Sequence, residues 1–331
     1  MSEPFKVERM PQVTLGPIEQ SFGKLALGCW VFGRTHWGGQ SVQDSRAVME
    51  AALRRGMNHF DTSGAFGDGV SEQLVGEFLK QDYHRREGMF IATKLLPREG
   101  TKEEVEKALI ASRERLGVEV IDLYYVQWPL PRVDMRPLFE VLNKEVEEGR
   151  VRAVGVSNFS VEQIRKVREA CPIAAAQFCY NLLWRPPEVE NELIPFCDES
   201  GIAAITYSSI AQGILTGRFS SEPMFAAGDN RVHTVWHERD VWPKVYAAVE
   251  KMKPIAKEAG RPLSHLAIRW LARKAELNTI TVGARTSVQL NELAGAMVGE
   301  IDDAHLDKLT AISDELMPSL PDAGNIFRYY P

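Results

Sequence analysis

Short apolar runs rich in β-branched residues alternate with longer segments of helical period along most of the chain. Each run ends in polar or glycine residues, where burial would stop. The pattern predicts eight strands, at Leu25–Trp30, Met57–Asp61, Met89–Lys94, Ile121–Gln127, Val151–Ser157, Ile173–Gln177, Ala203–Tyr207 and Thr279–Gly283.

Apolar positions three and four residues apart predict the helices between these strands. Gly56 is typical of a residue that closes a helix, Ser71 is expected to cap the next helix, and Thr101 with Glu104 forms a capping-box pattern. The predicted helices are Ser41–Arg55, Ser71–Lys80, Thr101–Leu116, Arg136–Glu148, Val161–Ala170, Val189–Ser200, Asp240–Gly260, Leu263–Lys274 and Asp303–Glu315.

Strand–helix repetition of this kind builds parallel βα units, and eight units close a (β/α)₈ TIM barrel. A doubly wound sheet would need a G-x-G-x-x-G turn after the first strand, and residues 33–39 lack that spacing. The segment from Val13 to Gly23 is expected to form an N-terminal β-hairpin that plugs the bottom of the barrel. We therefore predict one barrel domain over residues 1–331, with extra helices.

Composition narrows the class of function. A net charge of −6 without a basic stripe argues against a nucleic-acid partner. No apolar run is long enough to cross a membrane, and the N-terminus lacks the apolar segment of a signal peptide. The four cysteines show no zinc spacing, so we expect reduced thiols, no metal site and a cytoplasmic location. The oligomeric state stays open.

Catalytic side chains of such barrels come from the C-terminal ends of the strands. Asp61 and Lys94 end two neighbouring predicted strands, each directly after an apolar run. An uncompensated buried charge is costly, so the two side chains are expected to face each other. The pair is either a structural ion pair at the rim or part of a catalytic site.

Many short motifs resemble those of the aldo-keto reductase family, and they occur in the family's order over most of the chain. The matching stretches are Leu27–Trp30, Phe60–Ser63 with Gly67 and Ser71-Glu72, Ala92–Lys94, Asp122–Tyr124 with Trp128-Pro129, Gly155–Phe159, Gln177 with Tyr180–Leu182, Tyr207–Gly217 and Val282–Thr286. The resemblance implies a nicotinamide-dependent oxidoreductase that acts on a small-molecule carbonyl or alcohol.

The resemblance also implies a site for an extended dinucleotide. Ser157, Asn158 and Gln177 should hold the nicotinamide carboxamide, and Tyr207 should stack on the ring. The pyrophosphate loop should use Ser208, Ser209, Gln212, Gly213, Leu215 and Gly217, and the adenosine end should use Gly283, Arg285, Gln289 and Glu292. NADP(H) is favoured over NAD(H), although Leu293 stands where the family often has asparagine. The alternative is that these polar residues simply cap the barrel.

Two positions depart from the family's catalytic set of Asp, Tyr, Lys and His. Asp61 and Lys94 are present, but Phe66 stands at the tyrosine position and Gln127 at the histidine position. Carbonyl reduction needs a proton on oxygen as well as a hydride on carbon. Phe66 has no exchangeable proton, and the amide of Gln127 does not ionise near neutral pH. The set can orient an oxygen but cannot protonate it in the family's way.

Three residues are candidates for the missing proton donor. Lys94 could itself serve as acid or base. Tyr125 precedes Gln127 by two residues and is expected one layer deeper, as barrel core. His36 follows the first strand, where the family builds its substrate pocket, and is either catalytic or a solvated loop residue.

Aromatic residues are expected around the substrate. Trp30, Trp37, Trp128 and Phe66 would form a wall near the nicotinamide, of the kind that stacks on a sugar or another ring; ordinary packing is the alternative. The aromatic tail 325–331 folds over the barrel mouth, or else docks on a helix or a neighbouring subunit.

Three functions follow from this set, in order of preference. The first is an oxidoreductase with altered proton handling, acting on a sugar-like or other carbonyl or alcohol. The second is a redox-neutral epimerase, dehydratase or lyase that retains its cofactor. The third is a non-catalytic dinucleotide-binding or regulatory protein.

Overall fold

Eight parallel strands close a barrel in the computed structural model, which describes residues 10–16, 18–34, 37, 39–81, 86–188 and 192–329. Neighbouring strands follow the order β10-β3-β4-β5-β6-β7-β8-β9, so every strand except β10 pairs with the next one along the chain. The strands are β3 (Leu25–Gly28), β4 (His59–Asp61), β5 (Phe90–Leu95), β6 (Ile121–Val126), β7 (Val151–Ser157), β8 (Ala175–Cys179), β9 (Ala203–Tyr207) and β10 (Leu277–Val282). The predicted (β/α)₈ barrel is confirmed.

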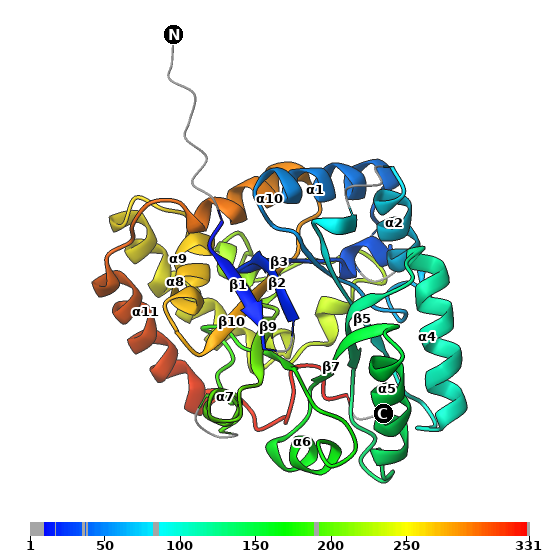
Figure 1. Ribbon diagram of the computed structural model, residues 1–331. Coiled ribbons are helices and arrows are strands. Elements are labelled where there is room, and N and C mark those ends of the chain that lie inside the picture. The colour runs from blue at the N-terminus through cyan, green and yellow to red at the C-terminus, as the bar shows by residue number, and fades with distance from the viewer. Residues whose placement is uncertain are drawn as a thin grey trace.

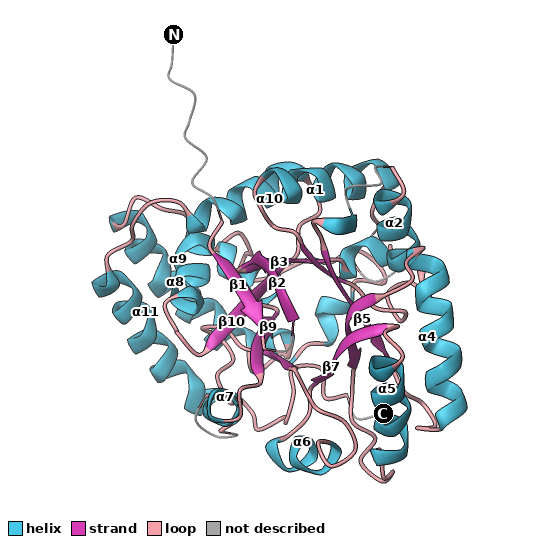
Figure 2. Cartoon of the chain, viewed as in Figure 1, coloured by secondary structure: helices cyan, strands magenta, loops and turns pink. Residues whose placement is uncertain are grey.

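Helices form an outer ring around these strands (Figures 1 and 2). They are α1 (Val42–Arg54), α2 (Val70–Leu79), α4 (Lys102–Leu116), α5 (Arg136–Glu147), α6 (Val161–Val167), α7 (Leu193–Glu199), α8 (Trp242–Glu258), α9 (Leu263–Ala272), α10 (Ser287–Ala294) and α11 (Asp303–Leu316). Short 3₁₀ helices are η1 (Trp30–Gly33), η2 (Ala211–Thr216), η3 (Asn230–His233), η4 (Val235–His237), η5 (Gly295–Met297) and η6 (Met317–Ser319).

Several predicted element ends are corrected by the structure. Trp30 belongs to η1 and not to the first barrel strand. Ser71 lies inside α2, because the left-handed Gly69 begins that helix and the Ser71 hydroxyl bonds the carbonyl oxygen of Cys29 instead. Helix α10 was not predicted, and residues 189–191 of the helix predicted at Val189–Ser200 lie outside the described residues.

The predicted hairpin closes the barrel's N-terminal end. Strands β1 (Gln12–Leu15) and β2 (Ile18–Gly23) pair antiparallel and cross that end of the barrel in Figure 1. Phe22 packs against His59 and Phe90, which begin β4 and β5. The hairpin therefore fills the N-terminal end of the barrel, whereas the C-terminal ends of the strands stay open for a site.

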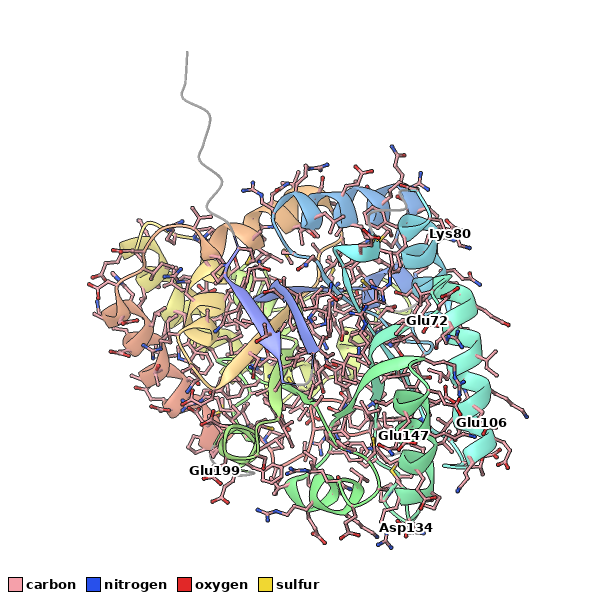
Figure 3. All side chains as sticks on the ribbon, in the orientation of Figure 1. Glu72, Lys80, Glu106, Asp134, Glu147 and Glu199 are labelled. Atoms are coloured by element: carbon pink, nitrogen blue, oxygen red, sulfur yellow. The ribbon has the colours of Figure 1, made fainter. Side chains whose placement is uncertain are left out.

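Charged side chains cover the outer helices, as the labelled Glu106, Glu147 and Glu199 show in Figure 3. No helix within the described ranges is long and apolar enough to cross a membrane. The cytoplasmic location stays a prediction.

Candidate active site

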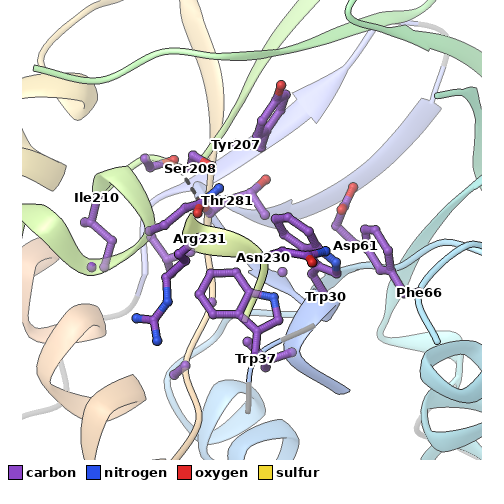
Figure 4. Close-up of a pocket in the computed structure, with 18 of the residues that line it drawn as sticks. Trp30, Trp37, Asp61, Phe66, Tyr207, Ser208, Ile210, Asn230, Arg231 and Thr281 are labelled. Atoms are coloured by element: carbon purple, nitrogen blue, oxygen red, sulfur yellow. Dashed lines mark hydrogen bonds between the residues drawn. The ribbon is translucent and has the colours of Figure 1, made fainter. Parts of the chain in front are cut away.

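A cavity of about 750 Å³ opens at the C-terminal ends of the strands, a volume within the usual range for small-molecule sites (Figure 4). Most of the predicted site residues line it: Trp30, Trp37, Asp61, Phe66, Lys94, Gln127, Trp128, Ser157, Asn158, Gln177, Tyr207, Ser208, Ser209, Gln212, Gly213, Gly283, Arg285, Gln289 and Glu292. Leu215 and Gly217 are not among the lining residues: Leu215 is fully buried, and Gly217 ends η2 in a left-handed conformation. His36 lies outside the described residues.

Asp61 and Lys94 meet at the floor of the cavity. Lys94 Nζ lies 2.5 Å from Asp61 Oδ1 and donates a second bond to the carbonyl oxygen of Thr62 at 2.9 Å. The other carboxylate oxygen of Asp61 accepts from Gln177 Nε2 at 2.9 Å. Side-chain exposure is only 3% for Lys94 and 6% for Asp61, so each charge relies on the other for compensation.

An ammonium group has three donors, and two of those on Lys94 are used in this way. Its nitrogen lies 5.5 Å from the centre of the Phe66 ring and 5.3 Å from that of Tyr125. Tyr125 is fully buried, as predicted for barrel core, and burial raises its pKa well above the usual value. Among the described residues, the third N–H of Lys94 has aromatic neighbours and no oxygen acceptor.

Close backbone contact sets the position of Phe66. Its ring stacks on Trp30, with centroids 5.9 Å apart. The following residue, Gly67, has φ +66°, and a Cβ there would lie 2.1 Å from the carbonyl oxygen of Gly33. Only glycine permits this approach of the loops after β3 and β4. The aromatic ring at 66 is therefore held by the backbone as well as by packing.

Gln127 is held at three points. Its backbone N–H bonds Leu95 O at 2.8 Å, and its carbonyl oxygen accepts from Asn158 Nδ2 at 3.0 Å. Its side-chain oxygen Oε1 lies 2.7 Å from the hydroxyl of Ser63, a residue that was not among the predicted site residues.

The three residues predicted for the nicotinamide carboxamide lie beside Tyr207, which was predicted to stack on the ring. Asn158 adopts φ +65°, so its amide reaches both Ser157 Oγ at 3.1 Å and the hydroxyl of Tyr207, which donates to Asn158 Oδ1 at 2.7 Å. Burial raises the pKa of Tyr207 well above its usual value, with the thiol of Cys179 adding to the effect. Tyr207 is thus a neutral ring at the wall of the cavity.

The C-terminal segment folds over the barrel mouth, which is one of the two arrangements expected for it. The Phe327 ring lies parallel to Tyr207 at 11°, with centroids 6.4 Å apart, and contacts Trp30 and Trp128 edge-on. Tyr329 contacts Trp128 in the same way. The predicted aromatic wall is therefore completed by residues from the chain's end.

The loop after β9 is built from tight turns. Ser208, Ala211, Gln212 and Gly213 all have positive φ, and the backbone N–H groups of Ala211 and Gly213 donate to the carbonyl oxygens of Ser208 and Ile210. The side-chain Nε2 of Gln212 is buried with no partner within the part of the chain that the structure describes. A buried donor without a partner is costly, so these residues fit a bound phosphate-containing cofactor.

Arginine and polar residues gather at the far end of the cavity. Arg285 Nη2 donates to Gly39 O at 2.7 Å, and its backbone N–H bonds the side chain of Gln289 at 2.9 Å. The exposed Arg218 pairs with Glu292 at 2.8 Å. The predicted adenosine end thus carries two guanidinium groups, of which Arg218 was missed.

Arg231 of η3 was also missed. Its guanidinium lies 5.1 Å from the Trp37 ring and pairs with Asp229, and Figure 4 shows Trp37 between Arg231 and Trp30. The sequence feature that could have pointed to Arg231 is its position in residues 208–241, an unusually long connection between a strand and a helix. Long connections are often functional.

Known proteins resemble the chain over nearly its whole length. The model of the "Aldo/keto reductase family" matches residues 24–314. The aldo-keto reductase YhdN of Bacillus subtilis is 32% identical over 309 residues, which cover 89% of this chain and 92% of that protein. A protein of Escherichia coli named NADH-specific methylglyoxal reductase is 27% identical, over 93% of this chain and 99% of its own. The structure of a glycerol dehydrogenase from Gluconobacter oxydans superposes with a TM-score of 0.83 at 26% identity, covering 94% of this chain and 97% of that one.

Proposed function

The chain belongs to the aldo/keto reductase family, and from this premise we propose a nicotinamide-dependent oxidoreductase in which Lys94 replaces the usual tyrosine as proton donor. The observation that carries the proposal is the third N–H of Lys94, which has no oxygen acceptor among the described residues and lines the cavity beside Phe66. The substrate is a carbonyl compound or the corresponding alcohol, in keeping with the names of the relatives.

Residues of the cavity wall fit the cofactor. Asn158, Ser157 and Gln177 would orient the carboxamide, Tyr207 would support the ring, and the loop from Ser208 to Gly213 would hold the pyrophosphate. The positive charge of Arg285 supports NADP(H) over NAD(H), because the former carries an additional phosphate, whereas the charge of Arg218 is paired with Glu292. One relative is named NADH-specific, so NADPH and NADH are compared directly as cofactors.

A bound reduced nicotinamide would supply the hydride to the carbonyl carbon. Lys94 meanwhile donates a hydrogen bond to the substrate oxygen and transfers a proton to it as the C=O π electrons move onto oxygen. The resulting neutral amine leaves Asp61 buried without its counter-charge, which favours return of a proton from solvent. Positioned acid catalysis of this kind is worth roughly 10²–10⁴-fold in rate. Alcohol oxidation runs the same steps in reverse.

The test is turnover of NADPH and NADH over a panel of aldehydes, ketones and polyols, for wild type, Lys94→Gln and Lys94→Arg. Both variants should lose activity about 100-fold or more, because glutamine does not ionise and arginine does not release its proton. Cofactor binding, followed by fluorescence, serves as the control. Silence of the wild type across the panel with cofactor bound would contradict the proposal.

A redox-neutral reaction is the second candidate, favoured by the loss of both proton-transferring side chains at 66 and 127 beside a retained Asp61–Lys94 pair. Product that forms without net change at the nicotinamide absorbance band would support it. Phe66→Tyr/Gln127→His tests the third possibility, a non-catalytic binder. If only that double variant reduces aldehydes, the scaffold is competent and the natural chain has another task.

A further inference from the structure

The hydroxyl of Ser63 lies in the loop after β4, is fully buried, and has three polar neighbours. It accepts from the backbone N–H of Ala65 at 3.1 Å, lies 2.7 Å from Gln127 Oε1, and lies 3.4 Å from the carbonyl oxygen of Lys94. That carbonyl oxygen already accepts from the backbone N–H of Gly64. The single hydrogen of Ser63 therefore has one short acceptor, the side-chain oxygen of Gln127.

The distance supports this direction of the bond. A separation of 2.7 Å is typical of O–H···O bonds, whereas N–H···O bonds centre on about 2.9–3.0 Å. The other end of the Gln127 amide, Nε2, has no hydrogen bond to any residue that the structure describes, and Gln127 lines the cavity. A glutamine can present either end of its amide, and here Ser63 selects the donor end.

We propose that Ser63 is a positioning residue that fixes Gln127 as a hydrogen-bond donor toward the substrate. Gln127 Nε2 and the third N–H of Lys94 then form a pair of donors on the same cavity. Neither nitrogen can accept a hydrogen bond, because an ammonium has no lone pair and the amide nitrogen of glutamine is a donor only. The pair selects ligands that present an oxygen acceptor, with the strongest preference for one that carries negative charge.

The inference deepens the proposed function, since the same oxygen would be the reacting one, but its test needs no turnover. The probe is acetate, which carries only acceptor oxygens, with sodium chloride at equal ionic strength as the control. Binding is followed on the side-chain N–H₂ signals of Gln127 in ¹H–¹⁵N spectra of the full chain, identified by their loss in Gln127→Glu.

Acetate should shift these signals in the wild type. In Ser63→Ala, which frees the amide to rotate, the acetate Kd should rise roughly fivefold, the size expected for one neutral hydrogen bond. Ser63→Thr keeps the hydroxyl and should stay within about twofold of wild type. Gln127→Glu replaces donors by a negative charge and should weaken acetate binding at least about tenfold, measured by tryptophan fluorescence.

Three results would overturn the inference. They are a wild type that does not respond to acetate, a Ser63→Ala variant that binds acetate as tightly as wild type, and a Ser63→Thr variant as weak as Ser63→Ala. The last would mean that size at 63 matters and its hydroxyl does not. An inactive wild type that nevertheless binds acetate as described would contradict the proposed oxidoreductase and leave the role of Ser63 standing.

Discussion

Removing the positive charge of Lys94 should destabilise the barrel strongly, because Asp61 would then be a buried carboxylate without a counter-charge. Both side chains are almost completely shielded from water, so solvent screening does not reduce the effect. Breaking one partner of a buried pair costs about 3–5 kcal/mol. Gln177 still donates to the second carboxylate oxygen, which places Lys94→Met near the lower limit, at about 3 kcal/mol.

The matched control is the double variant Asp61→Asn/Lys94→Met. This variant removes both charges and keeps an acceptor for Gln177. Its free energy of unfolding should therefore be about 2 kcal/mol higher than that of Lys94→Met. The assay is urea unfolding at pH 7, followed by circular dichroism and tryptophan fluorescence, whose transitions should coincide. The reasoning is refuted if Lys94→Met loses less than about 1 kcal/mol, or if the double variant is no more stable than Lys94→Met.

Three further outcomes are expected. Burial lowers the pKa of His59 from 6.5 to about 4, so the unfolded chain binds more protons between these values and stability falls as pH drops below 6.5. Measured by urea unfolding, the free energy of unfolding of His59→Phe should therefore fall by about 2.5 kcal/mol less than that of wild type between pH 7 and 4.5. Equal decreases in the two proteins would contradict this. Arg285→Ala should weaken the binding of NADPH about tenfold more than that of NADH in fluorescence titrations, if the Arg285 charge meets the additional phosphate. An equal loss of affinity for both cofactors would argue against that contact. Phe327→Ala should raise acrylamide quenching of tryptophan fluorescence, because the ring covers Trp30 and Trp128; the exposed control Val288→Ala should leave it unchanged.

Much of the barrel was predictable because burial leaves a regular trace in the chain. The eight strands were found because mostly apolar runs stop where polar groups begin, and the bounds of Val151–Ser157 and Ala203–Tyr207 match the prediction. The ends of helices and strands were harder to predict where a hydrogen bond to a residue distant in the sequence sets them. Ser71 resembles a helix cap, but the carbonyl oxygen of Cys29 binds its hydroxyl and Gly69 begins the helix instead.

Some contacts of the candidate site could likewise be predicted from the sequence, and others could not. Asp61 and Lys94 could be paired from sequence, because they end neighbouring parallel strands and each needs compensation for its charge. Arg231 could not be placed, because it lies in a long connection without hydrophobic periodicity, and its position over Trp37 depends on how that connection folds.

The amino-acid sequence alone determined which chemical groups this chain can bring to a strand end: an ammonium and a carboxylate are present, and ionisable groups are absent at 66 and 127. Only the tertiary structure decided which of them meet. Ser63 and Gln127 are 64 residues apart, and only the fold brings the Ser63 hydroxyl within 2.7 Å of Gln127 Oε1, a contact that no sequence pattern records. Phe327 reaches Tyr207 only because the last segment folds back over the barrel mouth. Hydrogen-bond direction and ring contact depend on separations of a few tenths of an ångström, whereas sequence patterns report only which faces are buried.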